Sequence, residues 1–154
     1  MKRILIVEDI VETLRWLVDI VRSAYPAATI CTANSVRTAL SKLDGQIDLA
    51  LIDLGLPDGS GLEILRGLNK ASPSAIKVVT TVMGDDASIV SSLSAGADGY
   101  LLKETEAAVL SRQLTQLSMG LPAISPSVAR RIMEHFRLTG PVASLDGRLT
   151  ERET

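Results

Sequence analysis

Three scarcities narrow the classes of protein to which this chain of 154 residues can belong. Aromatic residues make up only 3%, so the core must be aliphatic. Cys31 is the only cysteine, which excludes an internal disulfide and a zinc site built on cysteines. No apolar run approaches the roughly 18 residues of a membrane span, and the run that ends before Glu8 is too short for a signal peptide. With a formal net charge of −2, the chain as a whole is not expected to bind polyanions. We expect a soluble, cytoplasmic protein.

Short apolar runs alternate with segments of helical spacing along residues 1–120. The runs are too short for helices and rich in residues that favour strands; they cover residues 4–7, 29–32, 49–52, 76–81 and 100–102. Alternation of this kind predicts an α/β fold with a doubly wound, five-stranded parallel sheet and helices on both faces. The run at 4–7 is continuously apolar, as expected of a strand buried on both faces.

Ionisable or hydroxyl side chains stand where four of the five runs end. Glu8 and Asp9 follow the first run, Asp53 follows the third, Thr81 ends the fourth, and Lys103 follows the fifth. In open parallel sheets, sites form beyond the carboxyl ends of the strands. In the flavodoxin-like strand order 2-1-3-4-5, which we expect here, these four ends are contiguous.

This set of residues suits phosphoryl chemistry. Crowded carboxylates repel one another, and a hard divalent cation with oxygen ligands relieves that repulsion, which favours Mg²⁺. A lysine and a hydroxyl that face the cation suit the oxygens of a phosphoryl group in transfer, and Asp53 is then a candidate nucleophile. Taken singly, Glu8 and Asp9 read equally well as a helix cap, Asp53 as a turn residue and Lys103 as a surface group. Their coincidence at the strand ends favours the site.

The same segments resemble the receiver domain of two-component response regulators. The matching pieces are residues 4–9 (ILIVED), 51–61 (LIDLGLPDGSG) and 96–103 (GADGYLLK). The resemblance implies a signalling switch rather than an enzyme: Asp53 accepts phosphate from a sensor histidine kinase, by self-catalysed transfer and with slow autodephosphorylation.

The resemblance also implies roles for the remaining residues of the site. Asp9 would hold Mg²⁺ directly and Glu8 through water. Asp53 and the carbonyl of Gly55 would complete the protein ligands, and we expect glycine at 55 to let the backbone approach the metal. Lys103 would pair with the phosphate, Thr81 would be the switch hydroxyl, and Tyr100 the switch aromatic.

Two departures from the family pattern stand out. Many receivers carry a proline, usually after a cis bond, where this chain has Glu104. Thr80 is a rival to Thr81 for the switch position, and strand alternation lets only one of the two point at the site.

The tail resembles NarL/FixJ-type regulators, which carry a LuxR-type helix-turn-helix. Residues 125–129 (SPSVA) and 149–153 (LTERE) match the linker and the first helix of that domain. We expect a receiver domain at 1–120, a linker at 121–147 with a helix over about 125–137, capped by Ser125 with Pro126 in its first turn, and a truncated helix-turn-helix from 148 to 154. DNA would then be bound only through the missing part.

Three other functions fit part of the pattern. A haloacid-dehalogenase-type phosphatase needs a second Asp two residues after the nucleophile, where this chain has Gly55. A flavodoxin-like electron carrier needs a phosphate-binding loop after the first strand, where Glu8 and Asp9 would repel the phosphate. A receiver that binds partners without phosphorylation is disfavoured by the complete set of site residues.

The first helix, expected over about residues 10–24, has more apolar surface than one core-facing stripe requires. Val11, Leu14 and Val18 line one side, whereas Trp16 and Ile20 lie well round from them. A partly exposed apolar residue explains this plainly. The alternative is that the surplus meets the fifth helix or the tail helix (Val128, Ile132, Phe136) in a homodimer or a packed-back linker.

Overall fold

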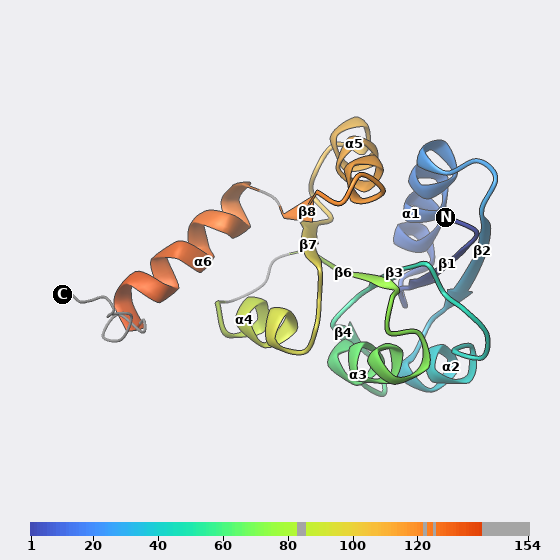
Figure 1. Ribbon diagram of the computed structural model, residues 1–154, viewed down its shortest axis with the longest axis horizontal. Coiled ribbons are helices and arrows are strands. Elements are labelled where there is room, and N and C mark those ends of the chain that lie inside the picture. The colour runs from blue at the N-terminus through green and yellow to red at the C-terminus, as the bar shows by residue number, and fades with distance from the viewer. Residues whose placement is uncertain (83–85, 122, 125, 140–154) are drawn as a thin grey trace.

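The computed structural model describes residues 1–82, 86–121, 123–124 and 126–139 (Figure 1). The strands are β1 (Arg3–Val7), β2 (Thr29–Ala33), β3 (Leu49–Ile52), β4 (Gly55–Leu56), β5 (Gly59–Ser60), β6 (Ile76–Thr81), β7 (Gly99–Leu102) and β8 (Ala123–Ile124). The helices are α1 (Val11–Ala24), α2 (Val36–Ser41), α3 (Gly61–Ala71), α4 (Asp86–Ser94), α5 (Ala107–Leu117) and α6 (Pro126–Thr139).

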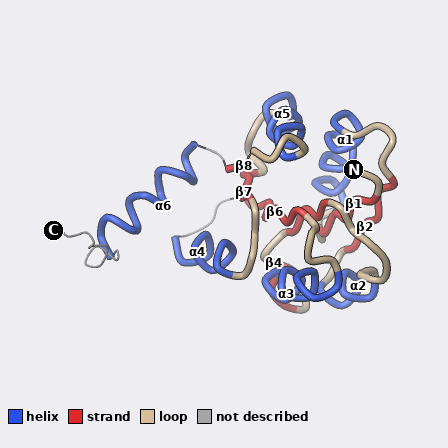
Figure 2. Tube along the Cα trace, viewed as in Figure 1, coloured by secondary structure: helices blue, strands red, loops and turns tan. Residues whose placement is uncertain are grey.

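One sheet, in the order β2-β1-β3-β6-β7-β8, forms the middle layer of the molecule (Figure 2). Each neighbouring pair in it is parallel, so the predicted five strands and their order 2-1-3-4-5 are confirmed. The sixth strand, β8, was not predicted, because residues 121–126 read as a loop. It extends the β7 edge by pairing Ile124 with Tyr100 and Ala123 with Gly99.

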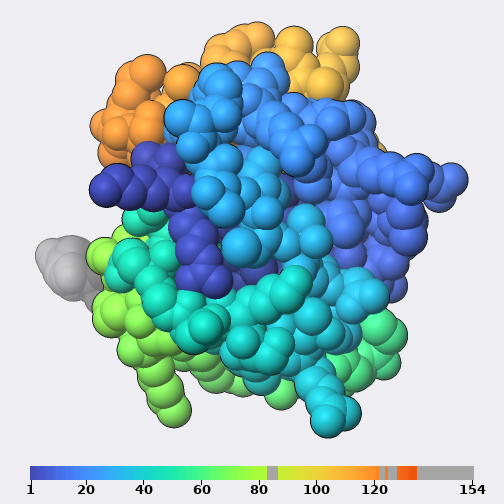
Figure 3. Space-filling view, turned by 90° about the vertical axis from the view of Figure 1, so that its right-hand side faces the viewer, coloured from blue at the N-terminus to red at the C-terminus, as the bar shows by residue number. Residues whose placement is uncertain are grey.

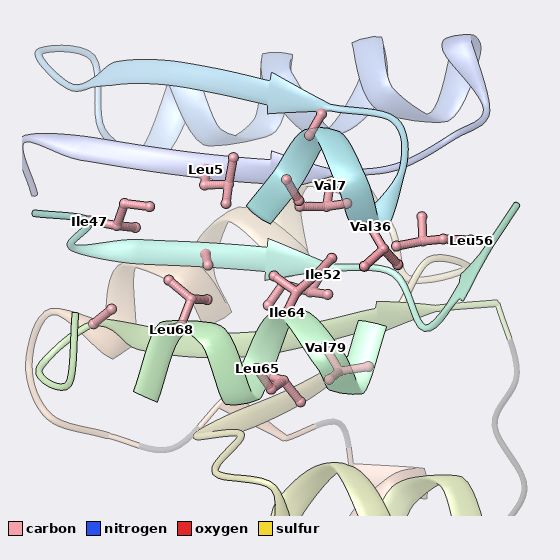
Figure 4. Packing of buried hydrophobic residues seen from close by; sticks show 14 of the residues in the cluster. Leu5, Val7, Val36, Ile47, Ile52, Leu56, Ile64, Leu65, Leu68 and Val79 are labelled. Atoms are coloured by element: carbon pink, nitrogen blue, oxygen red, sulfur yellow. The ribbon is translucent and has the colours of Figure 1, made fainter. Parts of the chain in front are cut away.

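Helices cover both faces of the sheet. α1 and α5 lie on one face, and α2, α3 and α4 lie on the other (Figure 1). On the second face, Leu5, Ile52 and Val79 of the strands meet Ile64 and Leu68 of α3, all fully buried (Figure 4). Burying one such side chain stabilises the fold by roughly 1.5–3 kcal/mol. Because each face of the sheet carries its own core cluster, helices pack against the sheet from both sides.

The chain enters α3 and α2 through paired caps. The Ser60 hydroxyl accepts from the N–H of Leu62 (3.2 Å). The Glu63 side chain accepts from the backbone N–H of Ser60, which completes a capping box at the start of α3. Asp58, in the turn between β4 and β5, accepts from the N–H groups of Val36 (2.8 Å) and Arg37 (3.0 Å) at the start of α2. These caps fix the loop that follows Asp53.

α6 packs back onto α4. It begins at Pro126 and ends at Thr139, close to the expected 125–137. Val128 is 1% exposed, and both it and Ile132 join the core cluster on the α4 side of the sheet. The predicted cap Ser125, the side chain of Phe136 and residues 140–154, which include the expected start of a helix-turn-helix, lie outside what the structure describes.

α1 buries one apolar stripe and leaves other apolar residues exposed. Leu17, Ile20 and Val21 are buried against the sheet and α5, whereas Val11 is 60% exposed. Trp16 is half-buried against the same cluster, so part of the apolar surplus is absorbed within the chain, against α5. Figure 3 shows the side of the molecule that carries α1 and β2, where the first third of the chain forms much of the surface.

None of the helices in the described part of the chain combines the length and apolar character that crossing a bilayer requires.

Candidate functional site

The carboxyl ends of β1 and β3 bring three acids together. The N–H of Glu8 donates to the carbonyl of Ala33 (3.0 Å), and the N–H of Asp53 donates to the carbonyl of Val7 (3.0 Å), so both acids continue the hydrogen-bond ladder of the sheet. Carboxylate oxygens of Glu8, Asp9 and Asp53 lie within 4.8 Å of one another. Glu8 is fully buried, Asp53 is 8% exposed, and Asp9 faces solvent.

Lys103 reaches this cluster from β7. Its backbone N–H donates to the carbonyl of Thr81 (2.7 Å), which fixes the residue at the strand end. Its ammonium forms ion pairs with Glu8 and, at 3.3 Å, with Asp53, while the side chain is only 7% exposed. The lysine is thus a buried cation that neutralises part of the acidic charge.

The cluster still favours an additional cation. Burial raises the pKa of the Glu8 carboxyl above its ordinary value, and the Lys103 ammonium and the N–H of Ile10 (3.1 Å) lower it only in part. Three carboxylates face one lysine, and the donor set consists of oxygen atoms, which hard divalent cations prefer. The acidic cluster of Glu8, Asp9 and Asp53 could therefore hold a metal ion.

The two threonines at the end of β6 face opposite sides of the sheet. Val79 belongs to the α2–α4 core cluster and Val78 to the α1–α5 cluster. Alternation therefore places Thr81 on the side of Tyr100, which is fully buried in the α2–α4 cluster, and Thr80 on the opposite side. Thr81 is partly exposed at the very end of the strand.

Comparison with known proteins identifies this arrangement. A family model described as the response regulator receiver domain matches residues 4–115. The chain belongs to this family. As a receiver domain it is a phosphorylation-dependent signalling switch of two-component systems. The predicted family and fold are confirmed.

Curated relatives of this receiver domain include response regulators and a transcriptional activator. The nitrate/nitrite response regulator protein NarL of Escherichia coli (strain K12) is 36% identical over 107 residues, which are 69% of this chain and 50% of NarL. The DNA-binding transcriptional activator DevR/DosR of Mycobacterium tuberculosis is 27% identical over 138 residues, which are 89% of this chain and 64% of that protein. The chain thus spans between half and two thirds of these relatives.

Solved structures share the fold. A CheY-like receiver domain protein from Methanospirillum hungatei superposes with a TM-score of 0.68 at 30% identity, covering 76% of this chain and 93% of that one. A LuxR-family response regulator from Aurantimonas sp. superposes with a TM-score of 0.74 at 24% identity, covering 86% and 96%.

Two glycines flank the loop that follows Asp53, and they differ in how closely other atoms approach them. A Cβ added at Gly55 would meet nothing within 4 Å of the protein's own atoms, so the predicted approach of its backbone to a metal stays a prediction. A Cβ at Gly61 would lie 2.3 Å from the carbonyl oxygen of Asp53 and 2.9 Å from Ile52. Gly61 therefore lets α3 begin against the backbone of the central acid. Sequence reasoning missed this role, although the matching segment 51–61 ends on this residue.

The turn after Lys103 carries Glu104 in place of the family's proline. No peptide bond in the described ranges is cis, so the bond between these two residues is trans. A groove of about 330 Å³ opens beside Lys103 and is lined by Glu12, Trp16 and Val82, among others.

Proposed function

We propose that Asp53 is the phosphoryl acceptor of this receiver domain, that the donor is a phosphohistidine of a sensor histidine kinase, and that the modification controls an attached DNA-binding regulator domain. The observation that supports this best is the position of Lys103, whose ammonium pairs with both Glu8 and Asp53 among three carboxylates. The name of the relative DevR/DosR, a DNA-binding transcriptional activator, supports the transcriptional output.

The transfer replaces one bond to phosphorus by another. A carboxylate oxygen of Asp53 attacks the phosphorus, a P–O bond forms, and the P–N bond to the donor imidazole breaks with its electron pair staying on nitrogen. Lys103, already 3.3 Å from Asp53, is placed to bind a phosphoryl oxygen and to offset the charge that arrives. The chain supplies this geometry itself, so small phosphodonors should also serve.

Mg²⁺ fits the oxygen-only cluster and would be held by Glu8, Asp9, Asp53 and the carbonyl of Gly55. When bound, it neutralises the carboxylates and the phosphoryl oxygens, which lets an anionic donor approach. A bound cation would stabilise the ionised form of Glu8 in particular, because this carboxyl group is fully buried and burial raises its pKa.

The output of the switch would pass through Thr81 and Tyr100. The hydroxyl of Thr81 stands at the end of β6, on the face that carries Tyr100 and α4. Drawing this hydroxyl toward a phosphoryl group on Asp53 would shift the end of β6. Hydrolysis of the phosphoryl group would be slow, because position 55 offers no carboxylate to activate water.

Mass spectrometry after incubation with acetyl phosphate and Mg²⁺ tests the acceptor. One phosphoryl group should be added to the wild type and none to Asp53→Asn, and EDTA should block the reaction. Asp44→Asn is the matched control, since the Asp44 side chain is 89% exposed and pairs only with Arg3 among the described residues; it should be phosphorylated normally. A phosphoryl group that persists in Asp53→Asn and maps to another residue would overturn the assignment.

A further inference from the structure

The hydroxyl of Thr80 is a buried polar group beside the acidic cluster that the proposed mechanism does not use. Thr80 is 1% exposed, and its Oγ1 has no hydrogen-bond partner in the part of the chain that the structure describes. Burying a hydroxyl without a partner is unfavourable, and such groups are rare enough in folded proteins to require an explanation. A partner that arrives in another state of the molecule is one explanation.

The register of the sheet places Thr80 next to Asp53. Ile52 of β3 pairs with Val79 of β6 on the α2–α4 side, and Leu51 pairs with Val78 on the α1–α5 side. The next pair in this register, Asp53 and Thr80, falls on the α1–α5 side again. Neighbouring strands are about 4.8 Å apart, so the register places the backbones of Thr80 and Asp53 side by side at the ends of β6 and β3.

The side chain of Lys103 spans the end of β6 to reach its two acidic partners. Lys103 follows β7, whereas its partners Asp53 and Glu8 follow β3 and β1, and β6 lies between β7 and β3. To reach both acids, the methylene stem of the lysine must pass over the end of β6. A covering of apolar methylene groups is consistent with a threonine that is buried and yet has no hydrogen bond.

We propose that Thr80 is a positioning residue whose hydroxyl donates a hydrogen bond to the carboxyl group of phosphorylated Asp53. The inference rests on the proposed role of Asp53 as acceptor. In the unmodified chain, the two oxygens of Asp53 face the N–H of Gly55 (3.4 Å) and the ammonium of Lys103 (3.3 Å). When Lys103 turns to the phosphoryl group, the Asp53 oxygen that is not bonded to phosphorus keeps a lone pair that can accept from Thr80. Thr80 thus acts on the Asp53 side of the sheet, and Thr81 on the Tyr100 side.

Thr80→Val tests the proposal, because it replaces the hydroxyl by a methyl group of similar size. The probe is beryllofluoride with Mg²⁺, a phosphoryl mimic, titrated while the fluorescence of Trp16 is followed. The Kd should rise about tenfold, as expected for a lost hydrogen bond to an ionic group. Thermal unfolding of the unmodified variant should occur at or above the wild-type temperature, since the hydroxyl has no partner in that state.

Two further variants separate the hydroxyl from packing. Thr80→Ser keeps the hydroxyl and should bind the mimic within about twofold of wild type, because the lost methyl group takes no part in the bond. Thr115→Val removes a hydroxyl that bonds within α5 (3.0 Å to the carbonyl of Ser111) and should leave the Kd unchanged. A wild-type Kd for Thr80→Val, or a Kd for Thr80→Ser as weak as that of Thr80→Val, would overturn the proposal. Either result, with phosphorylation still lost in Asp53→Asn, refutes the role of Thr80 and leaves the acceptor standing.

Discussion

Replacing Gly61 by alanine tests how closely α3 approaches the central acid of the site. The new Cβ would lie 2.3 Å from the carbonyl oxygen of Asp53, whereas ordinary van der Waals contact begins at 3.4 Å. The backbone must therefore open by roughly 1 Å, since dense cores leave no room to relax otherwise. Overpacking of this kind costs about 1–3 kcal/mol of the free energy of unfolding.

The displacement should affect chemistry as well as stability. The clashing carbonyl belongs to the residue that carries the nucleophilic carboxylate, and a misplacement of about 1 Å can slow a positioned reaction by roughly 100-fold. Urea unfolding should give the loss of stability, and the rate of phosphorylation by acetyl phosphate with Mg²⁺ should fall with it.

Gly55→Ala is the matched control for Gly61→Ala. It changes the same residue type in the same loop, but its Cβ meets nothing within 4 Å. We expect unfolding free energy equal to the wild type or higher by up to about 1 kcal/mol, because alanine restricts the unfolded chain. Equal stability and equal phosphorylation rates for Gly61→Ala and Gly55→Ala would refute the close approach of α3 to Asp53.

Three further outcomes are expected. Hydrogen bonds from the N–H groups of Arg3 (3.0 Å) and Lys2 (2.8 Å) lower the pKa of Asp48, so its stabilising effect is present above the ordinary carboxyl pKa and is lost as the pH falls through the lowered value. Urea unfolding should show Asp48→Asn less stable than wild type at pH 7 and nearly equal to it at pH 2; an equal deficit at both would contradict this. Thr81→Val should keep phosphate incorporation while the phosphorylation-dependent NMR shifts of α4 fade, and shifts that persist would remove Thr81 from the switch. Sedimentation with and without beryllofluoride should show a larger species only with the mimic if α1 or α6 mediates dimerisation, and a monomer in both states at tens of micromolar would exclude that.

The sheet could be predicted because its strands are apolar runs that end in chemically distinctive residues. The order was predictable for the same reason: Glu8, Asp53 and Lys103 make sense only if their strand ends are contiguous. β8 and the β4–β5 hairpin could not be predicted, since strands of two residues have no periodic signal.

Within the site, residue types were predictable and contacts were not. That Lys103 pairs with Glu8 as well as Asp53 depends on how far a side chain reaches across β6. Which threonine shares the face of Asp53 depends on the register at the last residue of β6, which the repeated Thr80-Thr81 leaves ambiguous. The contact between Gly61 and Asp53 depends on how α3 starts, a packing distance that no spacing encodes.

Because its first half is packed in the core, α6 converts a tilt near α4 into a displacement of its far end. Its 14 residues span roughly 21 Å, and Val128 and Ile132, near its first turns, root it in the core beside α4. The half of α6 beyond Ile132 is roughly 10 Å long, so tilting the anchored half by about 10° moves the far end by about 2 Å. A small rearrangement around α4 would therefore produce a displacement of about 2 Å at the end of α6.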